Sequence, residues 1–176
     1  MTSNTRTGPR ILGSLRSADG KGVVRVDDRF DTDIDDLWAA LTDPRRLARW
    51  YGAVEGELRL GGEFHLHLPD AGDRIGRVDA CEPPRRLALT MRDPDPPPGQ
   101  PDETVIETTL TADGNQTILV VEDRAMPLDL LAAYGAGVQI HVENLAAHIA
   151  GQERSDTEAR WDDLLPAYQA LAADVS

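Results

Sequence analysis

Alternating apolar and polar positions in the first two thirds of the chain predict a series of β-strands. In residues 23–30, Val24, Val26 and Phe30 alternate with charged residues, as expected of a strand with one buried face. Asp28 interrupts the apolar side of this pattern. Similar runs, separated by turns rich in glycine and proline, predict further strands at residues 11–16, 54–60, 63–68, 74–81, 86–91, 104–110 and 117–123.

Two short helical patterns follow the strand that ends at Phe30. Thr32 or Asp33 can cap the first helix, and apolar residues at helical spacing form its buried stripe: Ile34, Leu37, Trp38 and Leu41. Pro44 suits the first turn of a second helix, which we expect to extend through Arg49. Trp38 and the following Trp50 are expected to be structural core residues.

A long helix is predicted after Pro127, where the apolar spacing changes to alternating steps of three and four. The stripe predicts a helix about 33 Å long, at about 1.5 Å per residue, and consists of Leu128, Leu131, Gly135, Val138, Val142, Leu145 and Ile149. A glycine inside a helix costs about 1 kcal/mol relative to alanine. Gly135 and Gly137 therefore indicate a close approach of this helix to the sheet or to a ligand. A second helical run covers residues 157–172, with a kink or restart expected at Pro166.

The composition of the 176-residue chain narrows the class of protein. We expect one domain at residues 11–151, preceded by a disordered tail at residues 1–10 and followed by a helical extension at residues 152–176. A net charge of −13 argues against nucleic-acid binding, and no apolar run is long enough for membrane insertion. With Cys81 as the single cysteine, no internal disulfide can form, which favours a cytoplasmic location.

Several short motifs resemble the SRPBCC (START-like) superfamily over roughly residues 22–150. The opening of the superfamily domain is resembled by three segments of this chain: Phe30-Asp31, Trp38 to Pro44 and Trp50-Tyr51. Its middle is resembled by two more: Gly61-Gly62-Glu63-Phe64 and Pro83-Pro84-Arg85-Arg86-Leu87. Within the superfamily, the chain is similar to the branch named for activators of the heat-shock protein ATPase. The resemblance implies an α+β helix-grip fold, in which a curved antiparallel sheet wraps around the long C-terminal helix and leaves an apolar cavity. Val138 stands where this branch commonly places a tryptophan. The smaller valine side chain would enlarge or reshape that cavity.

A ligand-binding cavity is therefore expected where the sheet and the long helix face each other. The candidate lining residues are Phe64, Leu66, Leu68, Leu87, Leu89, Met91, Tyr134, Val138 and His141. The alternative interpretation is that these residues form a solid core. Tyr134, His141 and His148 repeat at steps of seven on one side of the helix, and such groups can hydrogen-bond a ligand or act as an acid or base.

Other polar residues suggest chemistry less strongly. Glu63, His65 and His67 share one strand face and could bind zinc, but this face should be exposed to solvent. Asp28 requires a basic partner such as Arg124, or a water molecule, if it lies inside. We expect Cys81 to be a small buried residue. No metal or cofactor is expected, because the sequence has no Cys-rich metal site, phosphate-binding loop or Rossmann glycine motif, and it has no Ser-His-Asp order either.

These features favour a non-enzymatic protein that binds a small hydrophobic molecule. A polyketide cyclase or dehydratase that uses Tyr134 or His141 as acid or base is the first alternative. The second is a protein-interaction or co-chaperone role, with the acidic surface, Trp161 and Tyr168 forming the contact with a protein partner. The C-terminal helix could instead support a homodimer.

Overall fold

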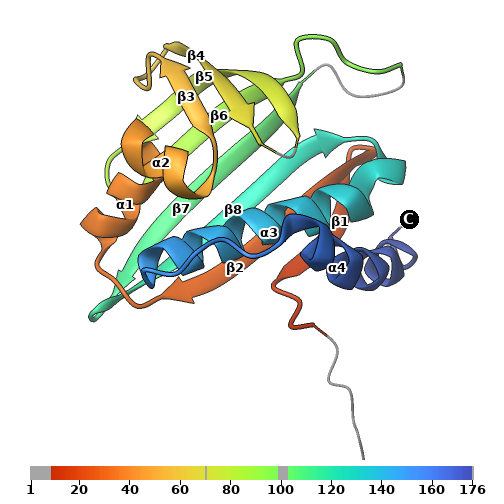
Figure 1. Ribbon diagram of the computed structural model, residues 1–176. Coiled ribbons are helices and arrows are strands. Elements are labelled where there is room, and N and C mark those ends of the chain that lie inside the picture. Colours follow the sequence, from red (N-terminus) through yellow and green to blue (C-terminus); the bar gives the residue numbers. More distant parts are fainter. Residues whose placement is uncertain (1–8, 70, 99–102, 176) are drawn as a thin grey trace, which may run out of the picture.

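Eight antiparallel strands form one curved sheet in the computed structural model, which describes residues 9–69, 71–98 and 103–175 (Figure 1). The spatial order of the strands is β1-β2-β8-β7-β6-β5-β4-β3. Their bounds are β1 Gly13–Ala18, β2 Lys21–Phe30, β3 Ala53–Gly56, β4 Glu63–Leu68, β5 Gly72–Glu82, β6 Arg86–Arg92, β7 Thr104–Asp113 and β8 Gln116–Met126. Strand β4 begins and ends where the alternation predicts, whereas β3 is shorter than the predicted run of residues 54–60.

The pairing of β2 with β8 joins the beginning of the sheet to its end. All other neighbouring strands in the sheet are also consecutive in the sequence. The register of β2 and β8 shifts between Gly22 and Val23, and Ala125, on the opposite strand, has a φ of 72°. This irregularity lies two residues after Asp123, which pairs with Val24 on β2 and with Ile106 on β7.

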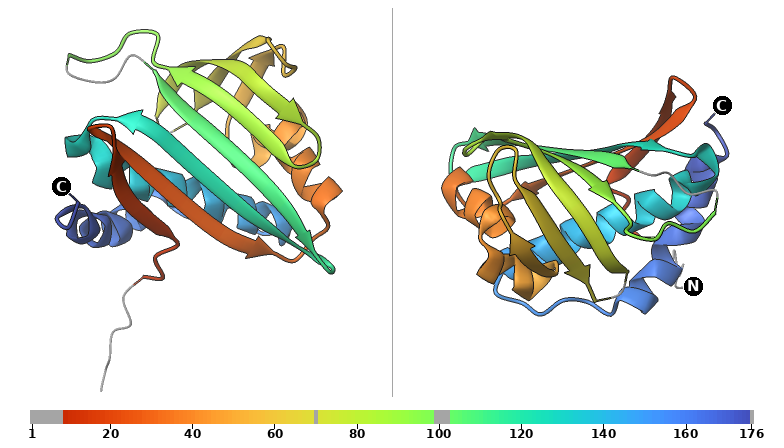
Figure 2. Two further views of the ribbon diagram at one scale, coloured as in Figure 1. Left: turned by 180° about the vertical axis from the view of Figure 1, so that it is seen from behind. Right: turned by 90° about the horizontal axis from the view of Figure 1, so that it is seen from above.

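All helices cover one face of the sheet, and the opposite face carries none (Figure 2). The helices are α1 Ile34–Thr42, α2 Pro44–Trp50, the 3-10 turn η1 Leu128–Leu130, α3 Leu131–Ile149 and α4 Thr157–Ala172. Helix α3 lies along β2 and β8, and α1 and α2 form a separate wall beside it (Figure 1). None of the helices in the described part of the chain is long and apolar enough to cross a membrane.

Local sequence signals determine where α1 and α2 begin. The carboxylate of Asp33 accepts a 2.8 Å hydrogen bond from the backbone N–H of Asp36 and caps α1. Asp43 caps α2 by accepting a 2.9 Å hydrogen bond from the backbone N–H of Arg45, and Pro44 occupies the first turn. The indole of Trp50 donates a 2.9 Å hydrogen bond to the carbonyl of Ala40, which holds the two helices together.

Helix α4 packs against α3 and against the edge strand β1. Tyr168 is completely buried there, in a small core with Ala136, Ile140 and Leu164. It cannot form the protein contact that the sequence suggested, because its side chain is inside its own chain. Helix α4 also runs through Pro166 without a restart.

The close approach predicted at Gly135 involves α4 and neither the sheet nor a ligand. A Cβ atom at Gly135 would lie 2.5 Å from Cδ1 of Tyr168, a distance that real Cβ contacts do not reach. Helix α3 is therefore buried on two sides, by the sheet and by α4. This second contact explains why Gln139 is buried although it lies off the predicted apolar stripe.

Candidate ligand chamber

Three adjoining cavities lie on the helix-covered face of the sheet. The first, here called the apolar cavity, has a volume of about 320 Å³, the central cavity about 110 Å³ and the polar cavity about 350 Å³. Tyr51 borders all three, and we refer to the set as the chamber. The apolar and polar cavities each fall within the range of small-molecule sites, about 300–1,000 Å³.

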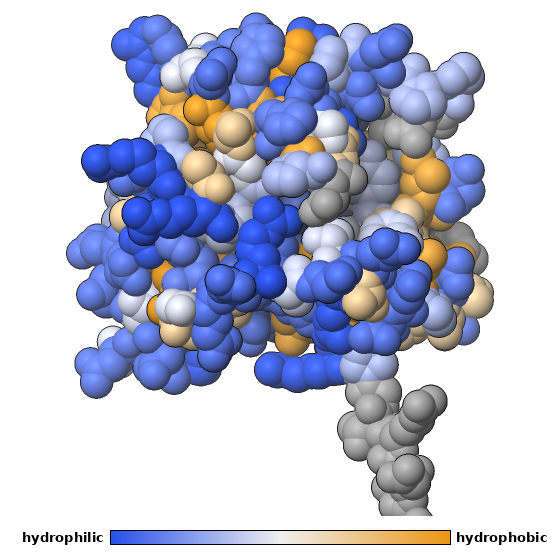
Figure 3. Space-filling model, viewed as in Figure 1, coloured by the Kyte–Doolittle hydropathy of each residue, from blue (hydrophilic) through white to orange (hydrophobic). Residues whose placement is uncertain are grey.

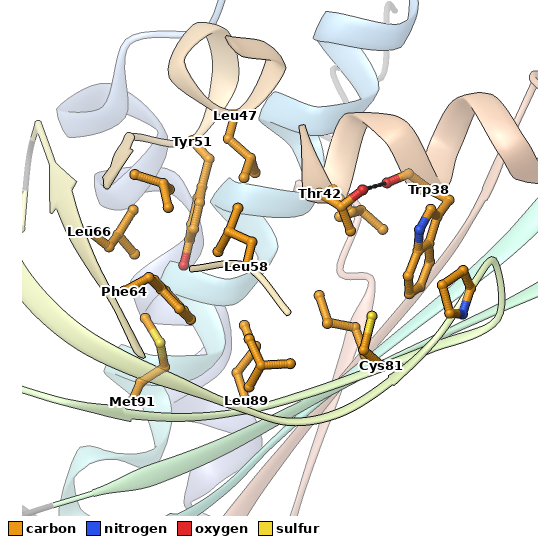
Figure 4. A pocket seen from close by; sticks show the side chains of 15 residues that line it. Trp38, Thr42, Leu47, Tyr51, Leu58, Phe64, Leu66, Cys81, Leu89 and Met91 are labelled. Carbon is orange, nitrogen blue, oxygen red and sulfur yellow. Dashed lines mark hydrogen bonds between the residues drawn. The ribbon is translucent and has the colours of Figure 1, made fainter. Parts of the chain in front are cut away.

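The apolar cavity lies between α1, α2 and strands β3 to β6 (Figure 4). Trp38 and Leu41 of α1 face Phe64, Leu66 and other apolar residues of the sheet across this space. The hydroxyl of Thr42 donates to the carbonyl of Trp38 at 2.8 Å, so even this polar group is satisfied within α1. Trp38 is only partly buried, which makes it a cavity wall as much as a core residue.

The central cavity lies beside Val138, between α3 and the middle of the sheet. Leu89 of β6, Ile106 of β7 and Val121 of β8 line it from the sheet. These three residues and Val138 are only partly buried, although they belong to the covered face. The space next to Val138 is therefore not filled by side chains.

Tyr51 lies where the three cavities meet. It directly follows α2 and reaches toward the sheet with its hydroxyl directed away from the helix (Figure 4). Its ring packs edge-on against the imidazole of His141, with the ring centroids 4.8 Å apart. Burial raises the pKa of Tyr51 to about 12, so the phenol is a hydrogen-bonding group and is not ionised at neutral pH.

Polar side chains gather in the polar cavity, near the start of α3. Asp123 of β8, Arg74 of β5 and Thr104 of β7 line it from the sheet, and Tyr134 and His141 line it from α3. Trp161 of α4 completes the wall. The apolar and central cavities share wall residues with this polar end, so the chamber as a whole is amphipathic.

Asp123 differs from these residues because its carboxyl group is buried and incompletely hydrogen-bonded. It is 3% exposed, and no donor among the described residues forms a hydrogen bond with its Oδ1. Burial raises the pKa of its carboxyl group to about 7, against a smaller lowering effect of the backbone N–H of Arg124. The negative charge of Asp123 also contributes to raising the pKa of Tyr51 and of Tyr134, after burial as the main cause.

Arg74 does not neutralise Asp123. Its guanidinium lies 3.5 Å from the carboxylate of Asp93 and donates to the backbone carbonyls of Ala71 and Asp73 at 3.1 and 2.8 Å. These contacts hold the guanidinium beside Asp93.

Each residue that the sequence predicts for the cavity lies on the wall of this chamber. Phe64 and Leu66 line the apolar cavity, Leu68 and Tyr134 line the polar cavity, and the others border two cavities each: Leu87, Leu89, Met91, Val138 and His141. Their role in binding a ligand is taken up below as a proposal.

His148 lies outside the chamber, although the spacing of seven links it to Tyr134 and His141. Its Nε2 accepts a 3.1 Å hydrogen bond from Arg46, and burial followed by the charge of Arg46 lowers its pKa. It lines a separate surface cavity with Arg49 and Asn144. A side chain about two helical turns beyond His141 cannot take part in chemistry in the polar cavity.

The remaining candidates have ordinary structural surroundings. His65 and His67 are exposed, and His67 pairs with Asp73 at 2.6 Å. No group of His, Cys, Asp and Glu side chains within the described residues is arranged to hold a metal ion.

Asp28 has Arg10 as its basic partner at 3.6 Å, in place of the expected Arg124. Cys81 is partly exposed and lines the apolar cavity, so it is not simply buried.

Sequence reasoning missed Asp123 and Tyr51. Asp123 is in phase with Leu119 and Val121 on β8, a signal that its side chain faces inward, as theirs do. Tyr51 was recognised only as part of a family motif. Its position between cavities depends on how α2 is placed over the sheet, which the local pattern does not specify.

Comparison with known proteins agrees with this architecture. Residues 31–150, more than half of the chain, match the family model described as Activator of Hsp90 ATPase homolog 1-like protein. The chain belongs to this family. The curved antiparallel sheet around α3 is the helix-grip fold of the SRPBCC superfamily, to which the family belongs. A search of curated proteins finds no match to this chain.

Several solved structures are similar over most of this length. CalU16 from Micromonospora echinospora is 27% identical with a TM-score of 0.74, and the alignment covers 92% of this chain and 96% of CalU16. DynU16, a protein in the dynemicin biosynthetic locus, is 28% identical with a TM-score of 0.69, covering 80% of this chain and 51% of DynU16. MLL2253 from Mesorhizobium loti is 25% identical with a TM-score of 0.67, covering 74% and 98% of the two chains. Because the alignment with CalU16 covers 92% of this chain, it must include part of residues 152–176.

Proposed function

We propose that this protein binds a small hydrophobic molecule in the chamber between the sheet and α3. The observation that carries the proposal is the open space beside Val138, where apolar side chains of the covered sheet face remain partly exposed. Protein interiors are normally packed without such voids. An apolar ligand that fills the space would remove this surface from water, which contributes a favourable free energy of about 25 cal/mol per Å².

Among the described residues, the face that carries the helices shows no large apolar patch to compete with the chamber (Figure 3). Hydrophobic side chains appear there in small groups among mostly hydrophilic ones (Figure 3). The chamber is therefore the better candidate for binding an apolar molecule. We propose a cytoplasmic location for this function, an expectation that rests on the single cysteine in the sequence.

The test is binding of an uncharged fluorescent probe such as phenylnaphthylamine, with native mass spectrometry for ligands retained from the cell. The wild-type protein should bind the probe, and Val138→Trp should weaken binding about ten-fold or more by filling the central cavity. Leu128→Trp is the matched control, because Leu128 is 40% exposed and lies outside the chamber. Absence of probe binding to the wild type, or equal binding by both variants, would contradict the proposal.

A cyclase-like enzyme is the second candidate function. It is favoured by the proton-transfer groups of the polar cavity and by the similarity to DynU16, whose gene lies in a biosynthetic locus. In this role Tyr134 or His141 would act as acid or base on a ligand held in the chamber. The test is turnover of a linear polyketide analogue by the wild type and by Tyr134→Phe and His141→Ala. Wild-type rates in both variants would rule out this assignment.

A further inference from the structure

The polar cavity contains a buried acid without a counter-charge. Asp123 is almost completely buried, and its Oδ1 has no hydrogen-bond donor among the described residues. An unpaired polar group in the interior costs free energy, and a charged one costs more. Elsewhere in the fold an inward-facing carboxylate has a basic partner, as Asp28 has Arg10. A cation supplied from outside would satisfy Asp123 in the same way.

The groups around Asp123 suit an ammonium group. The rings of Tyr51, Tyr134 and Trp161 border the same cavity, and aromatic rings attract cations in the absence of water. Arg74, the nearby cation at the rim, is paired with Asp93 and so leaves the carboxyl of Asp123 available. The net charge of −13 also favours the approach of a positively charged ligand.

The rest of the chamber suits an apolar body attached to that ammonium group. The polar cavity shares Val138, His141 and Ile106 with the central cavity, whose other wall residues are mainly apolar. A ligand with its charged end at Asp123 would therefore extend along α3 toward Leu89 and Val142. An anion would instead place its charge beside the buried carboxyl group.

We propose that the polar cavity is a binding site for the ammonium group of a hydrophobic amine, with Asp123 as its counter-ion. This rests on the proposed function and specifies the class of ligand. Binding the ammonium group requires the ionised carboxylate, and it would lower the raised pKa of Asp123. The charged or titratable groups that face the site are Tyr51, Arg74, Arg92, Asp93, Tyr134 and His141.

The experiment compares three probes that share one aromatic body: naphthylmethylamine, naphthalenemethanol and naphthalenecarboxylate. Isothermal titration at about one pH unit above the pKa of Asp123 should show the amine binding about 10- to 100-fold more tightly than the alcohol. The carboxylate should bind most weakly. In the wild-type protein the preference for the amine should decline as the pH falls through about 7, the pKa of Asp123.

Two isosteric variants locate the effect. Asp123→Asn should remove the preference for the amine and retain binding of the alcohol. Asp129→Asn removes one negative charge on the exposed surface, next to the cavity-lining Leu130, and should retain the preference. If amine and alcohol bind equally to the wild type, or if Asp129→Asn alone removes the preference, the amine site is wrong while hydrophobic binding stands. If neither these probes nor phenylnaphthylamine binds, both proposals fail.

Discussion

The hydroxyl of Tyr168 on α4 donates a 2.6 Å hydrogen bond to Oε1 of Gln139 on α3, and both side chains are completely buried. The same oxygen accepts a 3.0 Å hydrogen bond from the backbone N–H of Leu12, and Nε2 of Gln139 donates to the carbonyl of Arg10 at 2.7 Å. One amide thus joins α4, α3 and the segment before β1. The C-terminal helix is therefore part of the folded unit that supports one wall of the chamber.

Removing the hydroxyl of Tyr168 should destabilise the fold modestly. We expect Tyr168→Phe to lower the free energy of unfolding by about 1 kcal/mol, because Oε1 of Gln139 keeps only the hydrogen bond from Leu12. Urea denaturation followed by circular dichroism measures this difference. Tyr134→Phe is the control, since Tyr134 lines the polar cavity and the tyrosine hydroxyl bound to Gln139 is that of Tyr168. Equal losses in the two variants would show that the bond to Gln139 contributes nothing specific.

Adding a methyl group to α3 should have opposite effects at two nearby positions. In Gly135→Ala the new Cβ atom meets the ring of Tyr168 at 2.5 Å, so we expect a loss of about 1–3 kcal/mol in unfolding free energy. In Gly137→Ala it meets no atom within 4 Å, so the better helix propensity should stabilise the protein by up to about 1 kcal/mol. Thermal unfolding of both variants gives the comparison. A stabilised Gly135→Ala protein would mean that α4 does not pack as described.

Asp123 should make the protein less stable as the pH rises. The pKa of its carboxyl group is about 7 in the folded protein, compared with the ordinary value of 3.8 that applies to the unfolded chain. At a pH between these two values, the folded state holds a proton that the unfolded state has released. Stability therefore falls as the pH rises from about 4 to 7 and stays low above that range. We expect Asp123→Asn to stabilise the protein by a few kcal/mol, on the order of 2–4, at alkaline pH and to have little effect near pH 4. Melting curves of both proteins across this range measure the difference, and parallel profiles would contradict it.

Truncating Tyr51 should enlarge the space where the three cavities meet. Its ring borders all three, so Tyr51→Ala should admit a longer rod-shaped probe such as diphenylhexatriene, at a cost of about 3–5 kcal/mol in stability. Tyr51→Phe keeps the ring and serves as the control. Probe fluorescence and denaturant unfolding give the two readouts. Identical binding by both variants would show that the ring of Tyr51 does not limit the length of the ligand.

Residues whose environment is set by local pattern were predicted well. The strict alternation of β4 defines its bounds, and the acidic residues before α1 and α2 define where those helices begin. Gly135 shows the limit of this reasoning, because its partner Tyr168 is distant in the sequence and belongs to another helix. The same holds for Asp123: alternation could show that it faces inward, but not that Arg74 beside it would pair with Asp93.

The neighbouring positions of β2 and β8 have a consequence for synthesis on the ribosome. Strand β2 pairs with β1 in a hairpin, but its second partner, β8, follows almost a hundred residues later, and α3 follows β8 in the chain. Pairings this distant form late and slowly. A nascent chain therefore cannot complete the walls of the chamber until α3 has emerged, and until then its apolar strands are exposed to aggregation.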